Sequence, residues 1–340
     1  MDPGHPHGGN KSRIGPALWR VAVLHHGSTS SLALARLREG LHLRGLIHGV
    51  NCVVEAAGAE GQWARLPKLV EKLLHRGPDV MVAIGAVAAL SAQRATVRVP
   101  ILHAIVLDAE DIGLTARNVS GVTTFDPNQA TRHLRLLQEL VPGLRNVAVL
   151  TDADAPKGCD GRNPLVSRLL QVAAACGLET TSVALSGIDA NLEDAFRSLQ
   201  RAHAQVLVAL EVPAVLARLD DIACLSERHR LPMLSPFGWP STGVVMEGAS
   251  LHDAIDPLAA SVAALFRGAS VIDVPVLTVR HDRLLIHRGR AQRIGLIVPA
   301  RLIEQATQCI DDKALLLQGA GTDDGCAAGA LYIGKMSCHS

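Results

Sequence analysis

Two halves of this chain carry similar short apolar sequences at a constant spacing, and this repeat limits the possible folds more than any other feature. Val21–Leu24 (VAVL) recurs as Val147–Leu150, an offset of 126 residues (147 − 21). Val80–Ile84 (VMVAI) matches Val206–Leu210 (VLVAL) at the same offset (206 − 80). Two further pairs keep the order at an offset of 132: Gly45-Leu46 with Gly177-Leu178, and Val99–Leu102 with Leu231–Leu234. Matching units in the same order predict two similar lobes.

Short apolar runs alternate with helical patterns in both halves, which is the signature of parallel β/α units. Strands are expected over Arg20–Leu24, Val50–Glu55, Val80–Ile84, Ile101–Val106, Asn146–Leu150, Glu179–Ala184, Val206–Leu210, Met233–Ser235 and Leu284–His287. Helices are expected over Ser31–Arg44, Leu66–His75, Ala88–Ala95, Asn128–Leu140, Leu165–Cys176, Asn191–Ala202, Val215–His229, Asp256–Phe266 and Arg301–Ile310. The predicted fold is α/β, with two doubly wound parallel-sheet lobes joined by a hinge, like a type I periplasmic binding protein.

Crossover segments between the lobes are expected at Val119–Phe125 and Gly248–Asp253. These positions predict a first lobe from residues 19–122 and 253–272, and a second lobe from residues 123–252 and 273–312. Residues 1–18 are expected to be a disordered segment and residues 313–340 a Gly/Ala-rich tail.

The composition narrows the class of protein. Of the 340 residues, 48% are hydrophobic and 19% charged, so the chain can bury a core. The net charge of +1 lacks the basic excess typical of a nucleic-acid partner. The seven cysteines include no C-x-x-C pair, and no His or acidic cluster has metal-ligand spacing, so we expect no disulfide framework, metal or cofactor.

Several phrases, read in order, resemble the bacterial ABC-transporter substrate-binding proteins whose best-known members take tryptophan or tyrosine. They are Ala59–Pro67 (AEGQWARLP), Pro78–Thr96, Val119–Val122 (VSGV), Leu140–Leu150 (LVPGLRNVAVL), His229–Pro232 (HRLP) and Arg293–Pro299 (RIGLIVP). The resemblance spans about Arg20 to Ile310.

This resemblance implies a monomeric solute-binding component of an importer, which closes around a small amino-acid-like ligand, aromatic or not. Its expected partners are an ABC permease and its ATPase subunit, and it is not expected to be an enzyme. Members of this family lie in the periplasm or are anchored to the membrane outside the cell, and the resemblance implies the same location for this chain. Residues 1–20 lack the apolar core of a secretory signal, so a cytoplasmic location is the alternative.

Candidate ligand contacts follow the strands, because sites in open α/β sheets lie at the carboxyl ends of strands. Glu211 is the preferred partner for a ligand ammonium. Backbone N–H groups near Ala86–Ala88 would hold a carboxylate, without the hydroxyl contact, since Ala86 stands where the family usually has Ser or Thr; Gly85 before them is also an expected contact. The other expected contacts are His25, His26, Ser28, Asp108, Thr123, Asp152, Ser235, Phe237 and Glu247.

Each type of contact also has a structural interpretation. Ser28 suits a helix N-cap, Asp108 and Asp152 suit loop caps, and Phe237 suits hydrophobic cover of its lobe. Two other functions also fit the same fold. One is a cytosolic ligand sensor, although the 19 residues before Arg20 are too short for a helix-turn-helix. The other is an α/β enzyme acting in the cleft, although phosphate-loop and nucleophile-elbow motifs are missing.

Overall fold

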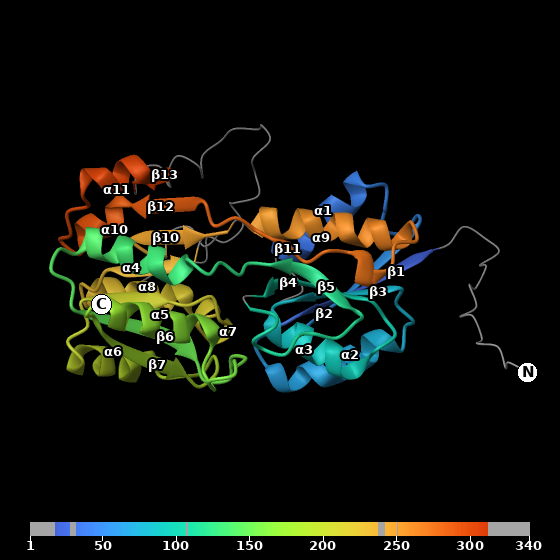
Figure 1. Cartoon of the computed structure of the whole chain (residues 1–340), viewed down its shortest axis with the longest axis horizontal. Helices are drawn as coiled ribbons and strands as arrows, with labels where there is room; N and C mark the ends of the chain where they lie inside the picture. Colours follow the sequence, from blue (N-terminus) through green and yellow to red (C-terminus); the bar gives the residue numbers. More distant parts are fainter. Residues whose placement is uncertain (1–17, 28–31, 107, 237–241, 250, 312–340) are drawn as a thin grey trace, which may run out of the picture.

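The computed structural model describes residues 18–27, 32–106, 108–236, 242–249 and 251–311. They form two lobes, each a β-sheet with helices on both faces (Figure 1). The expected segments 1–18 and 313–340 lie outside the described residues, apart from Leu18.

The first sheet has the strand order β2-β1-β3-β4-β5-β11, and all of its pairings are parallel. Its strands are β1 (Trp19–His25), β2 (Cys52–Gly58), β3 (Val80–Ile84), β4 (Ile101–Val106), β5 (Val119–Thr123) and β11 (Leu277–Thr278). Its helices are α1 (Leu32–Leu43), α2 (Leu66–Leu74), α3 (Ala86–Ala95) and α9 (Leu251–Phe266), with 3-10 turns at Trp63–Arg65 and Val271–Asp273.

Alternating side chains of these strands feed two separate cores. Val21 and Val23 pack with α1 and α9 on one face of the sheet. Ala22 and Leu24 pack with α2 and α3 on the other face. Because both faces are covered by helices, the strands consist of nearly continuous apolar runs, as buried parallel strands do.

The second sheet has the order β7-β6-β8-β9-β10-β12-β13, and only the β10–β12 pairing is antiparallel. Its strands are β6 (Asn146–Asp152), β7 (Glu179–Leu185), β8 (Val206–Ala209), β9 (Met233–Pro236), β10 (Val245–Gly248), β12 (Arg283–His287) and β13 (Gln308–Ile310). Its helices are α4 (Gln129–Leu140), α5 (Pro164–Ala175), α6 (Leu192–Arg201), α7 (Pro213–Leu216), α8 (Leu219–Arg228), α10 (Arg288–Arg293) and α11 (Ala300–Gln305).

The internal repeat is confirmed at the level of single residue pairs. Val21 lies opposite Val80 in the first sheet, and Val147 lies opposite Val206 in the second. The first five strands of each lobe also have the same spatial order. The predicted two-lobed α/β fold is therefore correct.

Two expected helices differ in the structure. The pattern over Val215–His229 forms two helices, because Arg218 leaves the helical conformation (φ −121°) between α7 and α8. The expected helix Arg301–Ile310 ends at Gln305, and the Thr307 N–H donates to the Leu284 carbonyl oxygen. That hydrogen bond lies beside the pairing of residues 308–310 with the edge strand β12, which turns them into a strand.

Across the described residues, the chain passes between the lobes three times, and the expected division, which changes lobe after residues 122, 252 and 272, also has three passages. It crosses after β5, between Gly248 and Leu251, and after Val279. Since β11 pairs with β5 and Val279 packs in the core beneath α9, residues 271–279 belong to the first lobe. The expected division had placed residues 273–312 in the second lobe.

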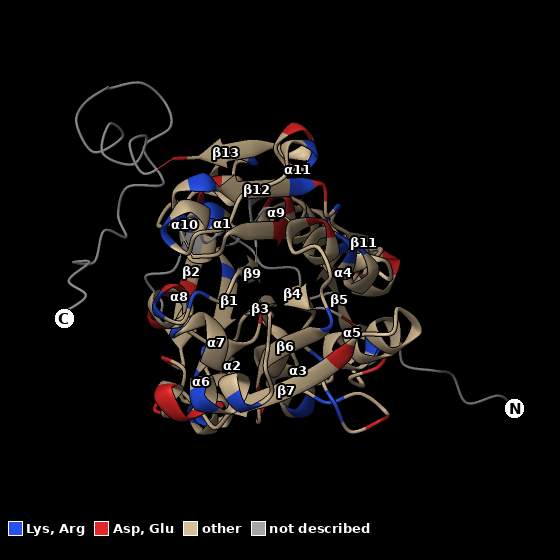
Figure 2. Cartoon of the chain, turned by 90° about the vertical axis from the view of Figure 1, so that its left-hand side faces the viewer, with Lys and Arg blue, Asp and Glu red and all other residues tan. Residues whose placement is uncertain are grey.

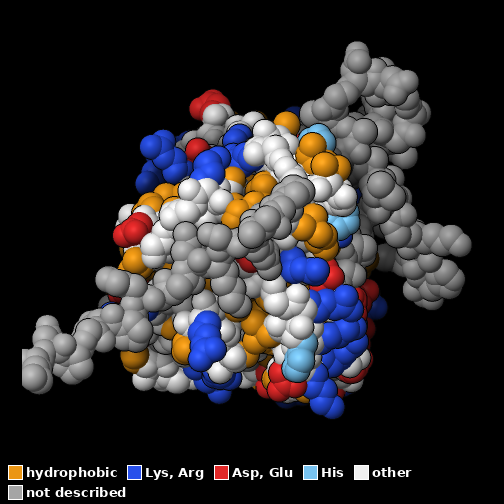
Figure 3. All heavy atoms as spheres, turned by 90° about the vertical axis from the view of Figure 1, so that its right-hand side faces the viewer, with side chains coloured by type: hydrophobic (Ala, Val, Ile, Leu, Met, Phe, Trp, Pro, Cys, Tyr) orange, Lys and Arg blue, Asp and Glu red, His pale blue; other side chains and the backbone are white. Residues whose placement is uncertain are grey.

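Acidic and basic side chains are interspersed over the helices of the second lobe, as expected for a net charge near zero (Figure 2). At the outer end of the first lobe, single hydrophobic side chains lie among charged ones (Figure 3). In the described ranges, no helix is both long and apolar enough to cross a membrane.

Candidate functional site

A cavity between the lobes, called here the first chamber, lies at the carboxyl ends of strands from both sheets. The first lobe lines it with His26, Gly85, Ala86, Val87, Ile105, Asp108 and Ile112. The second lobe lines it with Pro156, Asn163, Pro164, Glu211, Val212, Pro213 and Leu216. A compound bound here therefore contacts both lobes.

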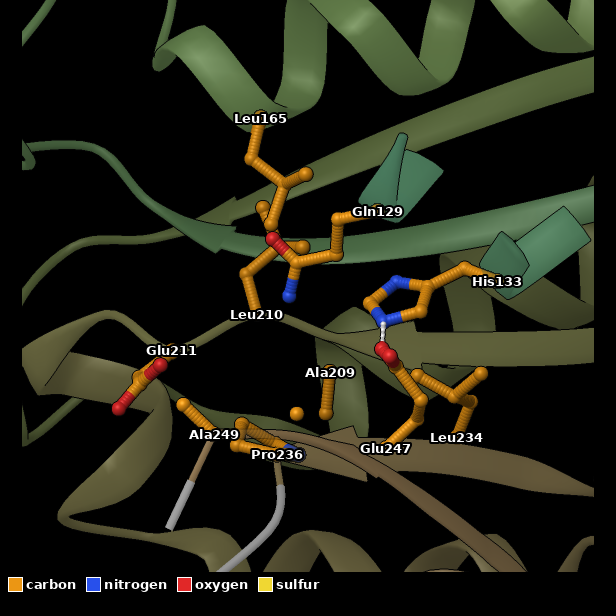
Figure 4. Close-up of a pocket in the computed structure, with 11 residues that line it drawn as sticks. Gln129, His133, Leu165, Ala209, Leu210, Glu211, Leu234, Pro236, Glu247 and Ala249 are labelled. Atoms are coloured by element: carbon orange, nitrogen blue, oxygen red, sulfur yellow. Dashed lines mark hydrogen bonds and ion pairs between the residues drawn. The ribbon is translucent and has the colours of Figure 1, made fainter. Parts of the chain in front are cut away.

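A second chamber lies deeper in the second lobe (Figure 4). It is lined by Gln129, His133, Leu165, Ala209, Leu210, Glu211, Leu234, Pro236, Glu247, Gly248 and Ala249. Glu211 lines both chambers. Glu211 is therefore the residue that the two linings share.

The first turn of α3 faces the first chamber. Gly85 precedes the helix with φ +95°, and no side chain caps the helix. The Ala89 N–H is bonded to the Gly85 carbonyl oxygen, so the N–H groups before it lack acceptors within the helix. Such N–H groups, together with the positive end of the helix dipole, attract carboxylates. The Gly85 N–H donates to the Ala104 carbonyl oxygen at 2.9 Å, so the N–H groups from Ala86 onward are the ones left for a ligand carboxylate.

His25 and His26 follow β1 and stack with ring centroids 4.8 Å apart. Burial, the nearby imidazole of His26 and, in opposition, a backbone hydrogen bond set the pKa of His25 at about 4. Burial also lowers the pKa of His26, so both rings are neutral near pH 7.

The partners of the two rings define opposite tautomers. Nδ1 of His26 lies 3.0 Å from the Ile84 carbonyl oxygen and must donate to it, so Nε2 of His26 is an acceptor. Nδ1 of His25 accepts from the Gly27 N–H at 2.7 Å, so Nε2 of His25 carries the proton. Of the two, His26 lines the first chamber and offers it an acceptor.

The two lobes touch at the rim of the first chamber. Asp108, from the first lobe, lies 3.6 Å from the guanidinium of Arg168 on α5. The Cys159 N–H of the second lobe donates to Asp111 over 3.1 Å. These contacts join the two lobes directly. Asp108 lines the first chamber, as expected of a site residue, but its carboxylate already faces a cation.

Glu211 has no hydrogen-bond or ion-pair partner among the described residues. Its side chain is half-buried where β8 passes into α7, and burial raises its pKa to about 7. A carboxyl group in this state binds a cationic partner strongly once the cleft excludes water. Within the described lining of both chambers there is no Lys or Arg to serve as that partner.

The sequence model of the family of ABC transporter substrate-binding proteins matches residues 20–310 of this chain. The chain belongs to this family. The resemblance seen in the sequence is thus confirmed.

Solved structures share the fold at low sequence identity. A conserved domain protein from Vibrio cholerae has a TM-score of 0.78 and 20% identity, covering 86% of this chain and 99% of that one. A Streptococcus pneumonia ABC domain in complex with L-Trp has a TM-score of 0.75 and 17% identity, covering 86% and 100%. A ligand-free, open substrate-binding protein from Clostridium difficile has a TM-score of 0.62 and 17% identity, covering 86% and 99%. Among curated proteins, no sequence matches significantly.

Gln129 is a residue of this substrate-binding protein that the sequence reasoning missed. It begins α4, its side chain is buried, and its amide lies beside Leu210 in the second chamber (Figure 4). No described residue hydrogen-bonds to that amide. The only signal in the sequence was its place directly after the first crossover.

Glu247 lines the second chamber but is held by the protein itself. Its Oε1 accepts from Arg132 Nε and Nη2 at 3.0 and 2.8 Å, and its Oε2 lies 2.7 Å from His133 Nε2. Burial opposes ionisation, but the hydrogen bonds and charges of His133 and Arg132 outweigh it and lower the pKa of Glu247. The predicted ligand contact remains a prediction, since this carboxylate already has two partners.

Of the other expected contacts, those that lie among the described residues line neither chamber. Thr123 donates to the Val106 carbonyl oxygen at 2.7 Å, and Ser235 lies 2.9 Å from the Thr242 hydroxyl. Asp152 accepts from the N–H groups of Ala214 and Asp154 at 2.8 and 2.9 Å, which makes it the cap of α7. Ser28 and Phe237 lie outside the described residues.

Metal chemistry has no obvious site here. Within the ranges that the structure describes, no group of three or more His, Cys, Asp or Glu side chains could hold an ion. The arrangement instead offers a helix N-terminus, a neutral imidazole acceptor and an unpartnered carboxyl group. These are groups for binding a small polar molecule that has both a negative and a positive end.

Proposed function

We propose that this chain is the solute-binding component of an ABC importer and that it captures a small amino-acid-like ligand between its lobes. The observation that carries the proposal is the Glu211 carboxyl group, which has no partner in the described part of the chain and lies across the first chamber from the N-terminus of α3. The α3 N–H groups would take the ligand carboxylate. Glu211 and Nε2 of His26 would take its ammonium.

Ligand capture would be coupled to hinge closure. The three crossovers connect the lobes, and the Asp108–Arg168 and Asp111–Cys159 contacts join them at the rim. A ligand that contacts both lobes stabilises the closed form, because it binds that form better than the open one. We propose that this protein works outside the cytoplasm as a monomer. In its closed form it delivers its ligand, without converting it chemically, to a permease that operates with an ATPase subunit.

A thermal-shift screen against the twenty amino acids tests this proposal. A ligand that binds only the folded state raises the melting temperature as its concentration exceeds Kd. We expect a rise with at least one amino acid, and we expect Glu211→Gln to abolish it. Glu110→Gln, which changes an exposed carboxylate outside both chambers, is the matched control and should keep the response.

Two results would contradict the proposal. One is the absence of a shift with any amino acid. The other is chemical conversion of the bound compound, measured by mass spectrometry after incubation, which would indicate an enzyme instead.

A further inference from the structure

The Gln129 amide is one of the polar groups that line the second chamber. The residue is 6% exposed, and its backbone N–H donates to the Asp126 carbonyl oxygen at 3.1 Å. Its side chain has no partner among the described residues. A buried amide without a hydrogen bond costs about 1–3 kcal/mol. A water or a bound molecule that completes the hydrogen bonds of such a side chain removes this cost.

The walls around this amide are aliphatic. They come from Leu165, Ala209, Leu210, Leu234, Pro236 and Ala249. Leu165 and Leu210 lie next to the Gln129 side chain, and Glu211 lies beyond them toward the first chamber (Figure 4). A group that enters the second chamber therefore meets aliphatic walls and the Gln129 amide, together with the side chains of His133, Glu211 and Glu247.

The charged side chains around this chamber disfavour a ligand side chain that carries a charge. Glu247 uses one carboxylate oxygen for Arg132 and the other for His133, so its charge is already compensated. An anionic group would face the carboxylates of Glu211 and Glu247 with no cation of the described lining to meet it. A cationic group would find the Glu247 carboxylate already paired, and under the proposed function Glu211 already holds the ligand ammonium.

We propose that the second chamber receives an uncharged side chain that ends in a carboxamide, and that Gln129 is the residue that selects it. The inference rests on the proposed function. With the ligand ammonium at Glu211, which lines both chambers, the ligand carboxylate reaches α3 and its side chain enters the second chamber. Two amides can exchange hydrogen bonds, since each has a carbonyl acceptor and an NH2 donor.

The discriminating measurement compares L-glutamine, L-asparagine, L-leucine and L-glutamate by isothermal titration calorimetry. A site built around a buried hydrogen-bonding group rejects analogues that lack the matching group. We expect the better of the two amides to bind at least about tenfold more tightly than leucine and glutamate. Gln129→Leu should weaken amide binding by a similar factor and leave leucine binding equal or tighter.

Gln292→Leu, which changes an exposed glutamine outside both chambers, is the control and should bind like the unaltered protein. Leucine or glutamate binding to the unaltered protein as tightly as both amides would overturn the inference, even if Gln129→Leu failed to fold. An unchanged amide affinity in folded Gln129→Leu would overturn it too. In both cases the protein still binds amino acids, so the proposed function survives. If no amino acid binds at all, the proposed function itself fails.

Discussion

Nε2 of His133 donates to Oε2 of Glu247 over 2.7 Å and joins α4 to β10 inside the second lobe. Both side chains are at least nine-tenths buried. Arg132 binds the other oxygen of Glu247 and also Asp126, at 2.6 Å, in the segment that enters from the first crossover. One network thus ties the wall of the second chamber to two of the three connections between the lobes.

Glu247→Ala should lower the free energy of unfolding by about 3 kcal/mol, because removing one partner of a buried ion pair leaves the other charges uncompensated. Urea denaturation at pH 7 measures the change. Glu55→Ala breaks the exposed pair with Arg76 (3.2 Å) and should cost under about 1 kcal/mol. Equal losses in the two variants would show that the Glu247 network contributes no more than a surface pair.

Acid should weaken the fold through the same carboxylate. The folded-state pKa of Glu247 lies below its ordinary value of 4.5, so the unfolded chain binds more protons as pH falls past that value. The contribution is present above pH 4.5 and is lost as pH falls through the folded-state pKa. Urea midpoints between pH 3 and pH 7 should therefore fall less steeply for Glu247→Gln than for the unaltered protein. Parallel curves would contradict this assignment.

Amino-acid binding should strengthen between pH 6 and pH 8. Burial holds the pKa of Glu211 at about 7, and only its ionised form pairs with an ammonium. The ionised fraction rises roughly tenfold over this range, and the association constant should follow it. Calorimetric titrations at both pH values measure the ratio. Glu211→Gln should flatten the dependence, whereas a profile unchanged in this variant would assign the titration to another group.

Gly85→Ala should destabilise the protein by about 1–3 kcal/mol, because a side chain would be forced into a strained positive-φ conformation. Here φ is +95°, and the new Cβ would lie 2.3 Å from Nδ1 of His26. Gly77→Ala is the matched control, since φ is +62° there and nothing lies within 4 Å of the added Cβ. It should lose only about 1 kcal/mol. Comparing the melting temperatures of the two variants shows whether the contact with His26 adds to the loss of stability.

The lobes and most element boundaries were predictable because buried parallel strands leave a strong local signal. Val80–Ile84 and Ile101–Val106 match the observed β3 and β4. The errors occur where distant partners decide the local structure. Residues 308–310 form a strand because β12 offers an open edge, and residues 277–278 join the first lobe because β5 does.

The site was predictable only in part. The rule that ligands bind at carboxyl ends of strands led to His26, Gly85, Ala86, Asp108 and Glu211, which the structure places around one chamber. The same rule cannot tell which carboxylates the protein uses itself. Asp152 caps α7, and Glu247 pairs with Arg132, because residues far away in the sequence face them. Gln129 lies at the start of a helix, and no motif around it in the sequence marks it as a ligand contact.

The placement of α9 and β11 has a consequence for how the protein is made. Both complete the first lobe, yet they follow β10 in the chain. A nascent chain therefore leaves the part of the apolar face that α9 covers on β4 and β5, including Leu102 and Val122, exposed until residues near Phe266 have been synthesised. A fragment that stops before α4 would keep this face exposed and tend to aggregate. The two lobes look separable, but the first one cannot finish folding before most of the second has been translated.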